Sequence, residues 1–450
     1  MVHRARVVTV AGTAAAVALG VAACAGPGGD SPSAGSTPTS MSTDVAAAGK
    51  VTLKLTDFWG SAEGKWIDAA VAGFQKKHPN VTIKRTTEDW GQLNSTLNLQ
   101  LQDDNGPDIA SANNGWQSLG TLAKGRLVLN LDSYAKAYGW TTEVPTSIAR
   151  QNQFTADFAT MGSGSWFATP MSRTSLIGLY YNADKLKQLG LQAPQSLADL
   201  EAAAAKAKAA GEVPFEYGSL DGSTSALLGV QALLADKKKL NDYIYDSPSV
   251  KANDVAMKQA VETVKKWADS GWFPKNFAGI DYQTAVSKFV GGEGVFRWEY
   301  TGSLGLTKQQ QSHFGYVQLP QTSGTKVGVG AAPGALVISA KCKHPDVAAA
   351  FLDYLMSPDT AQSAADLGLV PALSKDVKVP SDSLSLAGES AGAAALDGDD
   401  GYVPYFDWSS PTMLDTISGN LQLVYAGKMS PDDFTAAVDA DRDAFLAGKG

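Results

Sequence analysis

Residues that form disulfides or bind metals are scarce in this chain. Its 450 residues include two cysteines and four histidines, so no framework of several disulfides can form. Cys342 and His344 stand close together, but no second ligand pair accompanies them as a structural zinc site requires. The chain also lacks the Gly-x-Ser-x-Gly elbow of serine hydrolases. We therefore expect no metal, no cofactor and no catalytic residues, with stability coming from packed cores.

Excess positive charge is also absent. The formal net charge is −8 at pH 7, whereas a nucleic-acid-binding protein needs basic side chains to neutralise phosphates. After the first 23 residues, no apolar run approaches the roughly 20 residues that span a bilayer. These two absences exclude a nucleic-acid-binding protein and a multi-span membrane protein.

The N-terminus has the pattern of an export signal. Basic residues at 3–6 precede a weakly apolar run at 7–23, which ends in small residues. We therefore assign 1–23 to a signal peptide. The sequence Val21-Ala22-Ala23-Cys24 also resembles the lipobox of bacterial lipoproteins. That resemblance implies acylation of Cys24 and attachment to the extracellular face of the cell membrane; an ordinary signal peptide or a short anchor is the alternative.

A tether is expected to follow the anchor. Residues 25–49 are dominated by Gly, Ser, Pro, Thr and Ala and contain no aromatic residue. Such a segment cannot bury enough apolar surface to fold. We predict a lipid-anchored flexible tether over 24–49 and a folded region that begins near Lys50.

The folded region opens with alternating strands and helices. Alternation of apolar and polar residues predicts strands at 51–56 and 81–86, and a short apolar run predicts a third at 108–110. Helical spacing of large apolar residues predicts a helix that ends before Pro79 and another over 92–102. This order is typical of a parallel sheet covered on both faces.

Later helices are marked by their first residues. Ser196 is a predicted N-cap, and Pro345, Pro358 and Pro431 suit first helical positions. Residues 379–400 are rich in Ser, Ala, Gly and Asp and predict a long surface loop or a weak helix. The further predicted elements are helices at 196–210 and 255–267 and strands at 316–319 and 335–339.

Tryptophans in polar surroundings give the main functional signal. A flat indole beside carboxylates and amides suits a sugar ring, because the ring's C–H face stacks while its hydroxyls form hydrogen bonds. A single tryptophan is more often a core residue, and that reading stays open for each one. The tryptophans in such stretches are Trp59, Trp90, Trp116, Trp166, Trp298 and Trp408, with Asp57, Glu63, Asp89, Asn113, Asn114, Glu299 and Asp407 nearby.

A glycine-rich segment spans 327–335. It lacks the Gly-x-Gly-x-x-Gly spacing of a dinucleotide loop, and a predicted strand rather than a helix follows it. Close approach of the backbone to a ligand and a simple tight turn both fit this composition.

Taken together, several segments resemble one family. The chain is similar to the extracellular solute-binding proteins of bacterial sugar ABC importers, which include maltose-binding protein. One departure lies at 297–300, where charged residues surround Trp298. The resemblance rests on the order and spacing of residues 106–109, 125–132, 178–182, 287–296, 333–339, 344–352 and 368–371.

The resemblance implies an α/β fold of two lobes, each a mainly parallel sheet flanked by helices. It places 50–174 with 330–370 in an N-terminal lobe and 175–329 with 371–450 in a C-terminal lobe. Hinge crossings are expected near 174–177, 328–332 and 368–371. A ligand would bind between the lobes, and binding would close them.

The resemblance also implies a role in transport. A monomer would capture a mono- or oligosaccharide and deliver it to the transmembrane subunits of an ABC permease. A binding protein for a peptide, polyamine or polyol is the nearest alternative; a secreted glycoside hydrolase with paired carboxylates is more distant, as is an adhesion or structural protein. The expected ligand-binding residues are Trp59, Glu63, Asp89, Trp90, Asn113, Asn114, Trp116, Arg173, Trp298, Glu299, Gly334, Asp407 and Trp408.

The anchoring hypothesis predicts that Cys24→Ala releases a competent solute binder from the membrane, because acylation needs the thiol. Cell fractionation after signal cleavage measures this. A variant that still partitions with membranes would contradict the lipid anchor.

Overall fold

Residues 32–450 form one compact unit in the computed structural model. The structure describes residues 41–449 apart from 322–323, 332–334, 374–375 and 400. Cys24, the predicted signal peptide, most of the predicted tether and Gly334 therefore lie outside the described residues. Within the described part of the chain, no helix combines the length and the apolar character that a membrane span needs.

The first sheet contains β1 (Val51–Asp57), β2 (Val81–Thr87), β3 (Ile109–Ala112) and β10 (Ala335–Ile338), in the order β10-β3-β1-β2. Strand β1 is parallel to β2 and β3, and β10 is antiparallel to β3. In β1 the apolar residues are buried and alternate with exposed Thr52 and Lys54, as the sequence predicts. We call this sheet and its covering helices the first lobe.

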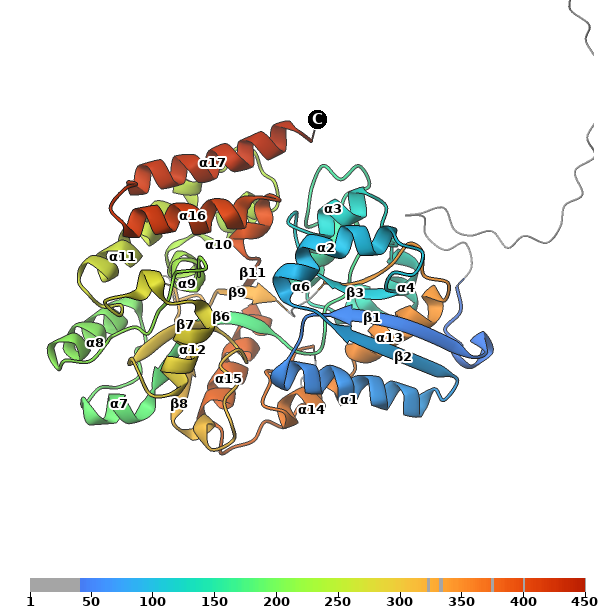
Figure 1. Cartoon of the computed structure of the whole chain (residues 1–450), viewed down its shortest axis with the longest axis horizontal. Coiled ribbons are helices and arrows are strands. Elements are labelled where there is room, and N and C mark those ends of the chain that lie inside the picture. Colours follow the sequence, from blue (N-terminus) through green and yellow to red (C-terminus); the bar gives the residue numbers. More distant parts are fainter. Residues whose placement is uncertain (1–40, 322–323, 332–334, 374–375, 400, 450) are drawn as a thin grey trace, which may run out of the picture. The chain divides into compact units, whose positions relative to one another are not determined.

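Helices cover both faces of the first sheet (Figure 1). On one face, α1 (Ser61–Lys77) and α13 (Pro345–Leu355) share a core with β1 and β2. On the other, α2 (Trp90–Gln102) buries its predicted stripe of Leu93, Leu97 and Leu101. Helix α14 (Pro358–Asp366) packs beside α1, where the indole N–H of Trp66 donates to the Thr360 carbonyl at 2.8 Å. Pro345 and Pro358 begin their helices, which confirms those two predictions.

The second sheet is built around β6 (Ser175–Asn182). Its other strands are β7 (Phe296–Tyr300), β8 (Phe314–Val317), β9 (Gly328–Ala331) and β11 (Tyr402–Val403). We call this sheet and its helices the second lobe. The remaining elements of both lobes are α3 (Leu119–Lys124), α4 (Asp132–Ala137), α5 (Trp140–Glu143), α6 (Thr146–Ala149), β4 (Gln153–Phe154), β5 (Ser165–Trp166), α7 (Ala183–Gln188), α8 (Leu197–Ala209), α9 (Ser225–Leu234), α10 (Lys237–Ile244), α11 (Met257–Asp269), α12 (Tyr282–Val290), α15 (Leu384–Asp399), α16 (Met413–Tyr425) and α17 (Pro431–Ala447).

The strand directions of the second sheet differ from the expectation of a mainly parallel sheet. Strand β6 is antiparallel to β7, β8 and β9, and only β9 and β11 are parallel. The physical reason is the route of the chain. Strand β6 leads away from the first lobe, whereas β9 leads back toward β10 in the first sheet, so these neighbours must run in opposite directions.

Helix α15 decides between the two readings of the segment at 379–400. The small residues there form a helix that packs closely on β8. A Cβ atom at Gly388 would lie 2.4 Å from the Tyr316 carbonyl oxygen, so the small side chains permit this close approach. The composition that favours a loop thus serves helix–strand packing.

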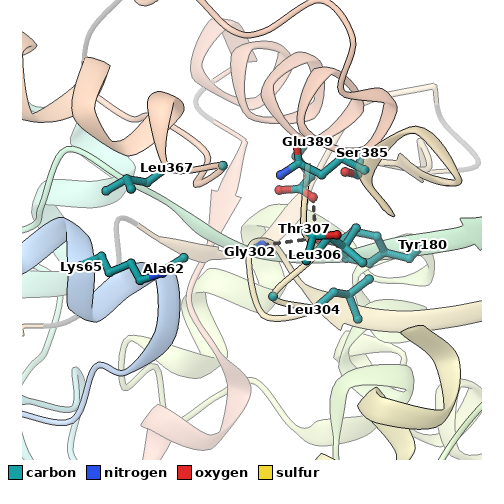
Figure 2. Close-up of a pocket in the computed structure, with 13 residues that line it drawn as sticks. Ala62, Lys65, Tyr180, Gly302, Leu304, Leu306, Thr307, Leu367, Ser385 and Glu389 are labelled. Atoms are coloured by element: carbon teal, nitrogen blue, oxygen red, sulfur yellow. Dashed lines mark hydrogen bonds between the residues drawn. The ribbon is translucent and has the colours of Figure 1, made fainter. Parts of the chain in front are cut away.

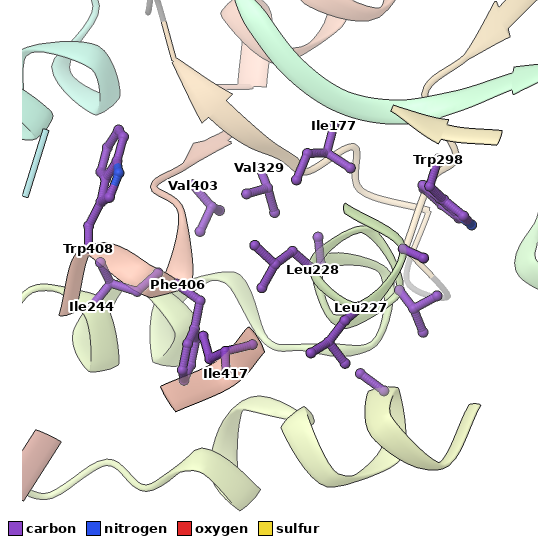
Figure 3. Close-up of a cluster of buried hydrophobic side chains, with 14 of the residues drawn as sticks. Ile177, Leu227, Leu228, Ile244, Trp298, Val329, Val403, Phe406, Trp408 and Ile417 are labelled. Atoms are coloured by element: carbon purple, nitrogen blue, oxygen red, sulfur yellow. The ribbon is translucent and has the colours of Figure 1, made fainter. Parts of the chain in front are cut away.

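The core of the second lobe lies on the face of its sheet that α9 covers (Figure 3). Ile177 on β6, Trp298 on β7 and Val329 on β9 pack against Leu227 and Leu228 of α9. The contact between α9 and Trp298 is tight, because a Cβ atom at Gly229 would lie 2.5 Å from the indole.

The chain passes between the two sheets beside β6. The N–H of Thr174 donates to the Val370 carbonyl at 3.0 Å, and the backbones of Arg173 and Pro371 pair in a short antiparallel β-bridge. Strands β9 and β10 are consecutive but belong to different sheets. Segments from three parts of the sequence therefore run side by side where the lobes meet.

The end of β1 carries a buried ion pair that stabilises the first lobe. Arg85 on β2 binds Asp57 through two nitrogens, at 2.6 Å and 2.7 Å. The Asp57 side chain is fully buried, whereas Asp68, which binds the same arginine at 3.0 Å, is 66% exposed.

Asp57→Ala should lower the free energy of unfolding by about 3–5 kcal/mol, because it leaves a largely buried arginine without its main partner. Asp68→Ala is the matched control and should cost less than about 1 kcal/mol. Urea denaturation measures both. Equal losses would contradict a dominant role for the Asp57 pair.

Candidate functional site

Most of the predicted binding residues of the first lobe follow its parallel strands. Glu63 and Trp59 follow β1, Asp89 and Trp90 follow β2, and the segment 113–116 follows β3. The carboxyl ends of parallel neighbours share one edge of a sheet, which is the usual ligand edge of open α/β folds. The topology therefore brings these segments to the edge that faces the second lobe (Figure 1).

A buried arginine lies at this edge. Arg173 is 2% exposed, and its Nη1 lies 2.8 Å from Oε1 of Glu63 in the first turn of α1. Its guanidinium also lies 5.7 Å from the Trp59 ring centre. The Nε atom of Arg173 is buried and has no hydrogen-bond partner in the described part of the chain. This group can donate a further hydrogen bond to a ligand oxygen.

An aromatic cluster of the second lobe lies at the same boundary. The rings of Tyr405 and Trp408 are 5.1 Å apart in an edge-to-face arrangement, and Tyr300 lies 5.8 Å from Tyr405. The Tyr405 hydroxyl donates to the Ser175 carbonyl at 3.2 Å. Between them in sequence, Asp407 is 8% exposed, and burial raises its pKa to about 6. The cluster combines apolar rings with a carboxylate that is largely shielded from solvent.

Trp116 and Trp408 form a direct contact between the lobes. The N–H of Trp116 donates to the Trp408 carbonyl at 3.0 Å. The Trp116 indole N–H donates to both carboxylate oxygens of Asp246, at 3.1 and 3.0 Å. Asp246 also pairs with Lys449 at 2.9 Å, and the Lys449 ammonium lies 3.7 Å from the Trp116 ring centre. These two tryptophans therefore hold the lobes against each other in this structure.

Other predicted residues are engaged in local structure. The Asp89 carboxylate caps α2 by accepting hydrogen bonds from the N–H groups of Gly91 and Gln92. Asn114 is buried and donates to the Gln151 carbonyl at 3.0 Å. Asn113 donates to the Gln117 side chain, and Trp90 is 40% exposed at the start of α2.

The structure places Trp298 and Glu299 inside the second lobe. Trp298 is 4% exposed in the core, and Figure 3 shows it far along the cluster from Trp408. Glu299 is fully buried and accepts hydrogen bonds from Arg297, at 2.6 and 2.9 Å, and from the Tyr282 hydroxyl at 2.9 Å. The unusual charges on both sides of Trp298 therefore neutralise each other.

A cavity of about 320 Å³ lies beside the first turns of α1, where Ala62 and Lys65 line it and the lobes meet (Figure 2). Its walls come from α1, β6, α15, the segment after β7 and the end of α14. At its wall the Tyr180 hydroxyl donates to Oε1 of Glu389 at 2.7 Å, and the Gly302 N–H donates to the Tyr180 oxygen at 3.2 Å. Burial raises the pKa of Glu389 to about 7.

Lys65, Tyr180, Gly302 and Glu389 line this cavity, and none of them was predicted from the sequence. One signal was available, because Glu389 is the only charged residue between Leu384 and Leu396. A lone charge among small and apolar residues of a helix calls for a partner or a ligand. The described residues contain no group of three or more potential metal ligands.

Sequence comparisons identify solute-binding relatives. A model of the family described as bacterial extracellular solute-binding protein matches residues 69–385. A multiple sugar-binding protein of Streptococcus mutans is 28% identical over 220 residues, covering 47% of this chain and 52% of that protein. A probable sugar-binding periplasmic protein of Mesorhizobium japonicum is 24% identical over 207 residues, covering 44% and 46%. The chain thus spans about half the length of the curated relatives it matches.

Solved structures with the same fold cover nearly the whole chain. A chitin oligosaccharide binding protein matches with a TM-score of 0.73 and 17% identity, over 89% of this chain and 100% of that one. The GacH receptor of Streptomyces glaucescens gives 0.68 and 18%, over 88% and 99%. RafE from Streptococcus pneumoniae gives 0.63 and 21%, over 88% and 98%. At these identities the likeness shows the shared two-lobed fold.

The contact between the lobes predicts a specific effect at Gly115. Its φ is +72°, and a Cβ atom there would lie 2.2 Å from Cβ of Trp408. Gly115→Ala should push the lobes apart and cost about 1–3 kcal/mol through overpacking, in addition to the backbone strain. Small-angle scattering should show a larger radius of gyration.

Gly190→Ala is the matched control, because Gly190 has a φ of +63° but open space around it. It should show the backbone strain alone and an unchanged radius of gyration. Identical behaviour of the two variants would contradict a constraint imposed by Trp408.

Proposed function

The chain belongs to the bacterial extracellular solute-binding protein family, and we propose that it is the sugar-binding component of an ABC importer. In this proposal it captures a mono- or oligosaccharide between its lobes and delivers it to a membrane permease. The observation that carries the proposal is that ring faces and hydrogen-bonding groups of both lobes meet at one boundary. Glu63, Trp59 and Arg173 come from the first-lobe side and Tyr405 and Trp408 from the second.

The chemistry of this boundary suits a polyhydroxylated ring. The hydroxyl groups around a sugar ring both donate and accept hydrogen bonds. The guanidinium of Arg173 supplies donors, and the carboxylates of Glu63 and Asp407 supply acceptors. The faces of Tyr405 and Trp408 supply apolar contact area. Two curated relatives carry sugar-binding names, which supports a sugar over a peptide or polyamine.

Closure would follow from differential binding. A solute that contacts both lobes binds the closed form more tightly than the open form, so it shifts the population toward closure. The hydrogen bond between Trp116 and Trp408 would then form part of the closed state that a permease recognises. No bond of the solute needs to break in this cycle.

The proposal places the protein on the outer face of the membrane through Cys24 and the part of the predicted tether before Met41. The last tether residues are folded, because Val45 is buried in the first-lobe core, so the folded region begins earlier than the predicted Lys50. The family supports an extracellular location, and the lipobox pattern supports the anchor. A monomer suffices, because both walls of the proposed site come from one chain.

The first test is a thermal-shift screen of mono-, oligo- and amino sugars. A ligand at 100 times its dissociation constant should stabilise the protein by about 2.7 kcal/mol. Prolonged incubation with oligosaccharides should leave them intact. Appearance of shorter products would contradict a binding-only function, and the absence of any stabilising sugar would contradict sugar binding.

Trp408 and Trp298 are both buried in this structure, and the second measurement separates a tryptophan that also contacts the ligand from one that serves the core alone. Trp408→Ala should weaken binding of the best sugar by about 1–3 kcal/mol, by analogy with the range measured for nucleic-acid bases stacked on aromatic side chains. Trp298→Ala should lower the free energy of unfolding by about 3–5 kcal/mol and leave the affinity of the folded protein unchanged. Isothermal titration and urea denaturation of both variants test this. A folded Trp408→Ala variant with the parent's affinity would overturn the proposed site.

A further inference from the structure

The cavity beside α1 is lined by a buried carboxylate, one oxygen of which accepts no hydrogen bond within 3.5 Å from the described residues. Glu389 is 4% exposed, and its Oε1 accepts the hydrogen bond of Tyr180. Its Oε2 is buried and has no hydrogen-bond partner among the described residues. Figure 2 shows the carboxylate above Tyr180 at the cavity wall. A buried acceptor that lacks a donor destabilises the folded state, so an occupant that supplies one would be bound favourably.

No cation of the described residues forms an ion pair with Glu389. Strand β6 contributes Tyr180 and β8 contributes Tyr316, and burial holds the pKa of both tyrosines well above 10. The short helix η5 (Gln310–Ser312) that packs against α15 is uncharged. Lys65 on α1 lines the opposite wall, and Figure 2 shows it across the cavity from Glu389. Among the groups that face it, Glu389 is thus the one that titrates near neutral pH.

One histidine also lies near this region. His313 follows η5 at the surface, where its Nδ1 lies 2.7 Å from Asp184. Both side chains are more than half exposed, and neither lines the cavity. A variant of Glu389 leaves His313 unchanged, so a loss of proton release in that variant is due to Glu389.

The remaining walls suit a small polar solute. Leu304, Leu306 and Leu367 give apolar surface, and Thr307, Ser385 and Gln311 add hydroxyl and amide groups. The volume of about 320 Å³ is at the lower end of the roughly 300–1,000 Å³ that ligand pockets occupy. One sugar ring, rather than a long oligosaccharide, is the occupant that this space favours.

We propose that Glu389 is a specificity-determining residue that accepts a hydrogen bond from a hydroxyl or ammonium group of the solute, and that binding releases a proton. The inference rests on the proposed sugar-binding function, and it adds Glu389 as a contact residue and the release of a proton on binding. The carboxylate form accepts the donor, and the proton of the acid form leaves to the solvent, so that charge and atoms balance.

The sign of the pH dependence follows from linkage. In the free protein the pKa of Glu389 is raised to about 7 by burial, and a bound donor favours the carboxylate and lowers this pKa. Affinity should therefore rise as the pH increases from about 6 to about 8, and level off above the pKa of the free protein. Near neutral pH, binding should release a fraction of a proton.

The experiment is isothermal titration of the full folded protein with glucose, maltose, raffinose and glucosamine, in two buffers of different ionisation enthalpy. The neutral sugars probe a hydroxyl donor and glucosamine probes an ammonium donor. The difference in binding enthalpy between the buffers gives the number of protons released. The parent should release protons with at least one probe, and Glu389→Gln should release none with that probe.

Glu216→Gln is the matched control. Glu216 is also buried, both of its carboxylate oxygens lack partners among the described residues, and burial raises its pKa to about 7. It does not line the cavity. Its substitution should leave proton release as in the parent.

Ala62→Leu tests the location independently, because it adds volume at the cavity wall without changing Glu389. It should weaken binding by about tenfold or more, with cooperative thermal unfolding retained. Sugar binding with equal proton release in the parent and Glu389→Gln, or with full affinity in Ala62→Leu, would overturn the inference and leave the proposed function intact. Failure of every probe to bind the parent would overturn both.

Discussion

The antiparallel pairing of β6 with β9 is the constraint on which the rest of the molecule depends. Strands β6 and β9 pair within the second sheet, and the chain then runs from β9 to β10 in the first sheet, so the covalent chain joins the two lobes beside this pair. It places Thr174 and Ser175 at the boundary, where the Thr174 N–H donates to the Val370 carbonyl and the Ser175 carbonyl accepts from the Tyr405 hydroxyl. The functional face is therefore a consequence of how the chain returns from one sheet to the other.

Buried charged groups at this boundary destabilise the folded protein when they lack hydrogen-bond partners. Arg173 has a buried nitrogen and Glu389 a buried oxygen for which the described part of the chain offers no hydrogen-bond partner, and the pKa values of Asp407 and Glu389 are raised. Each cost falls when a solute supplies the missing donor or acceptor. The free-energy cost of these unsatisfied groups is recovered on binding only when the solute has hydrogen-bonding groups in the matching positions.

Regular patterns made much of the fold predictable. The alternation in β1, the leucine stripe of α2 and the prolines that begin α13, α14 and α17 report local backbone preferences, and the structure confirms them. Side-chain placement depends on distant partners. Trp298 and Trp408 both stand in polar sequence, yet the structure buries both in one hydrophobic cluster, Trp298 against α9 and Trp408 beside Tyr405 where the lobes meet. Glu389 lies in a stretch without periodicity, so its place beside Tyr180 could be learned only from the fold.

The central claim is that a sugar draws the two lobes together at the Trp116–Trp408 contact. The backbone N–H of Trp116 crosses this boundary to the Trp408 carbonyl, so its exchange with solvent deuterium reports directly on closure. Hydrogen exchange with and without a saturating sugar measures it. The account predicts slower exchange of the Trp116 amide when the sugar is bound, and exchange at an unchanged rate would contradict closure around the ligand.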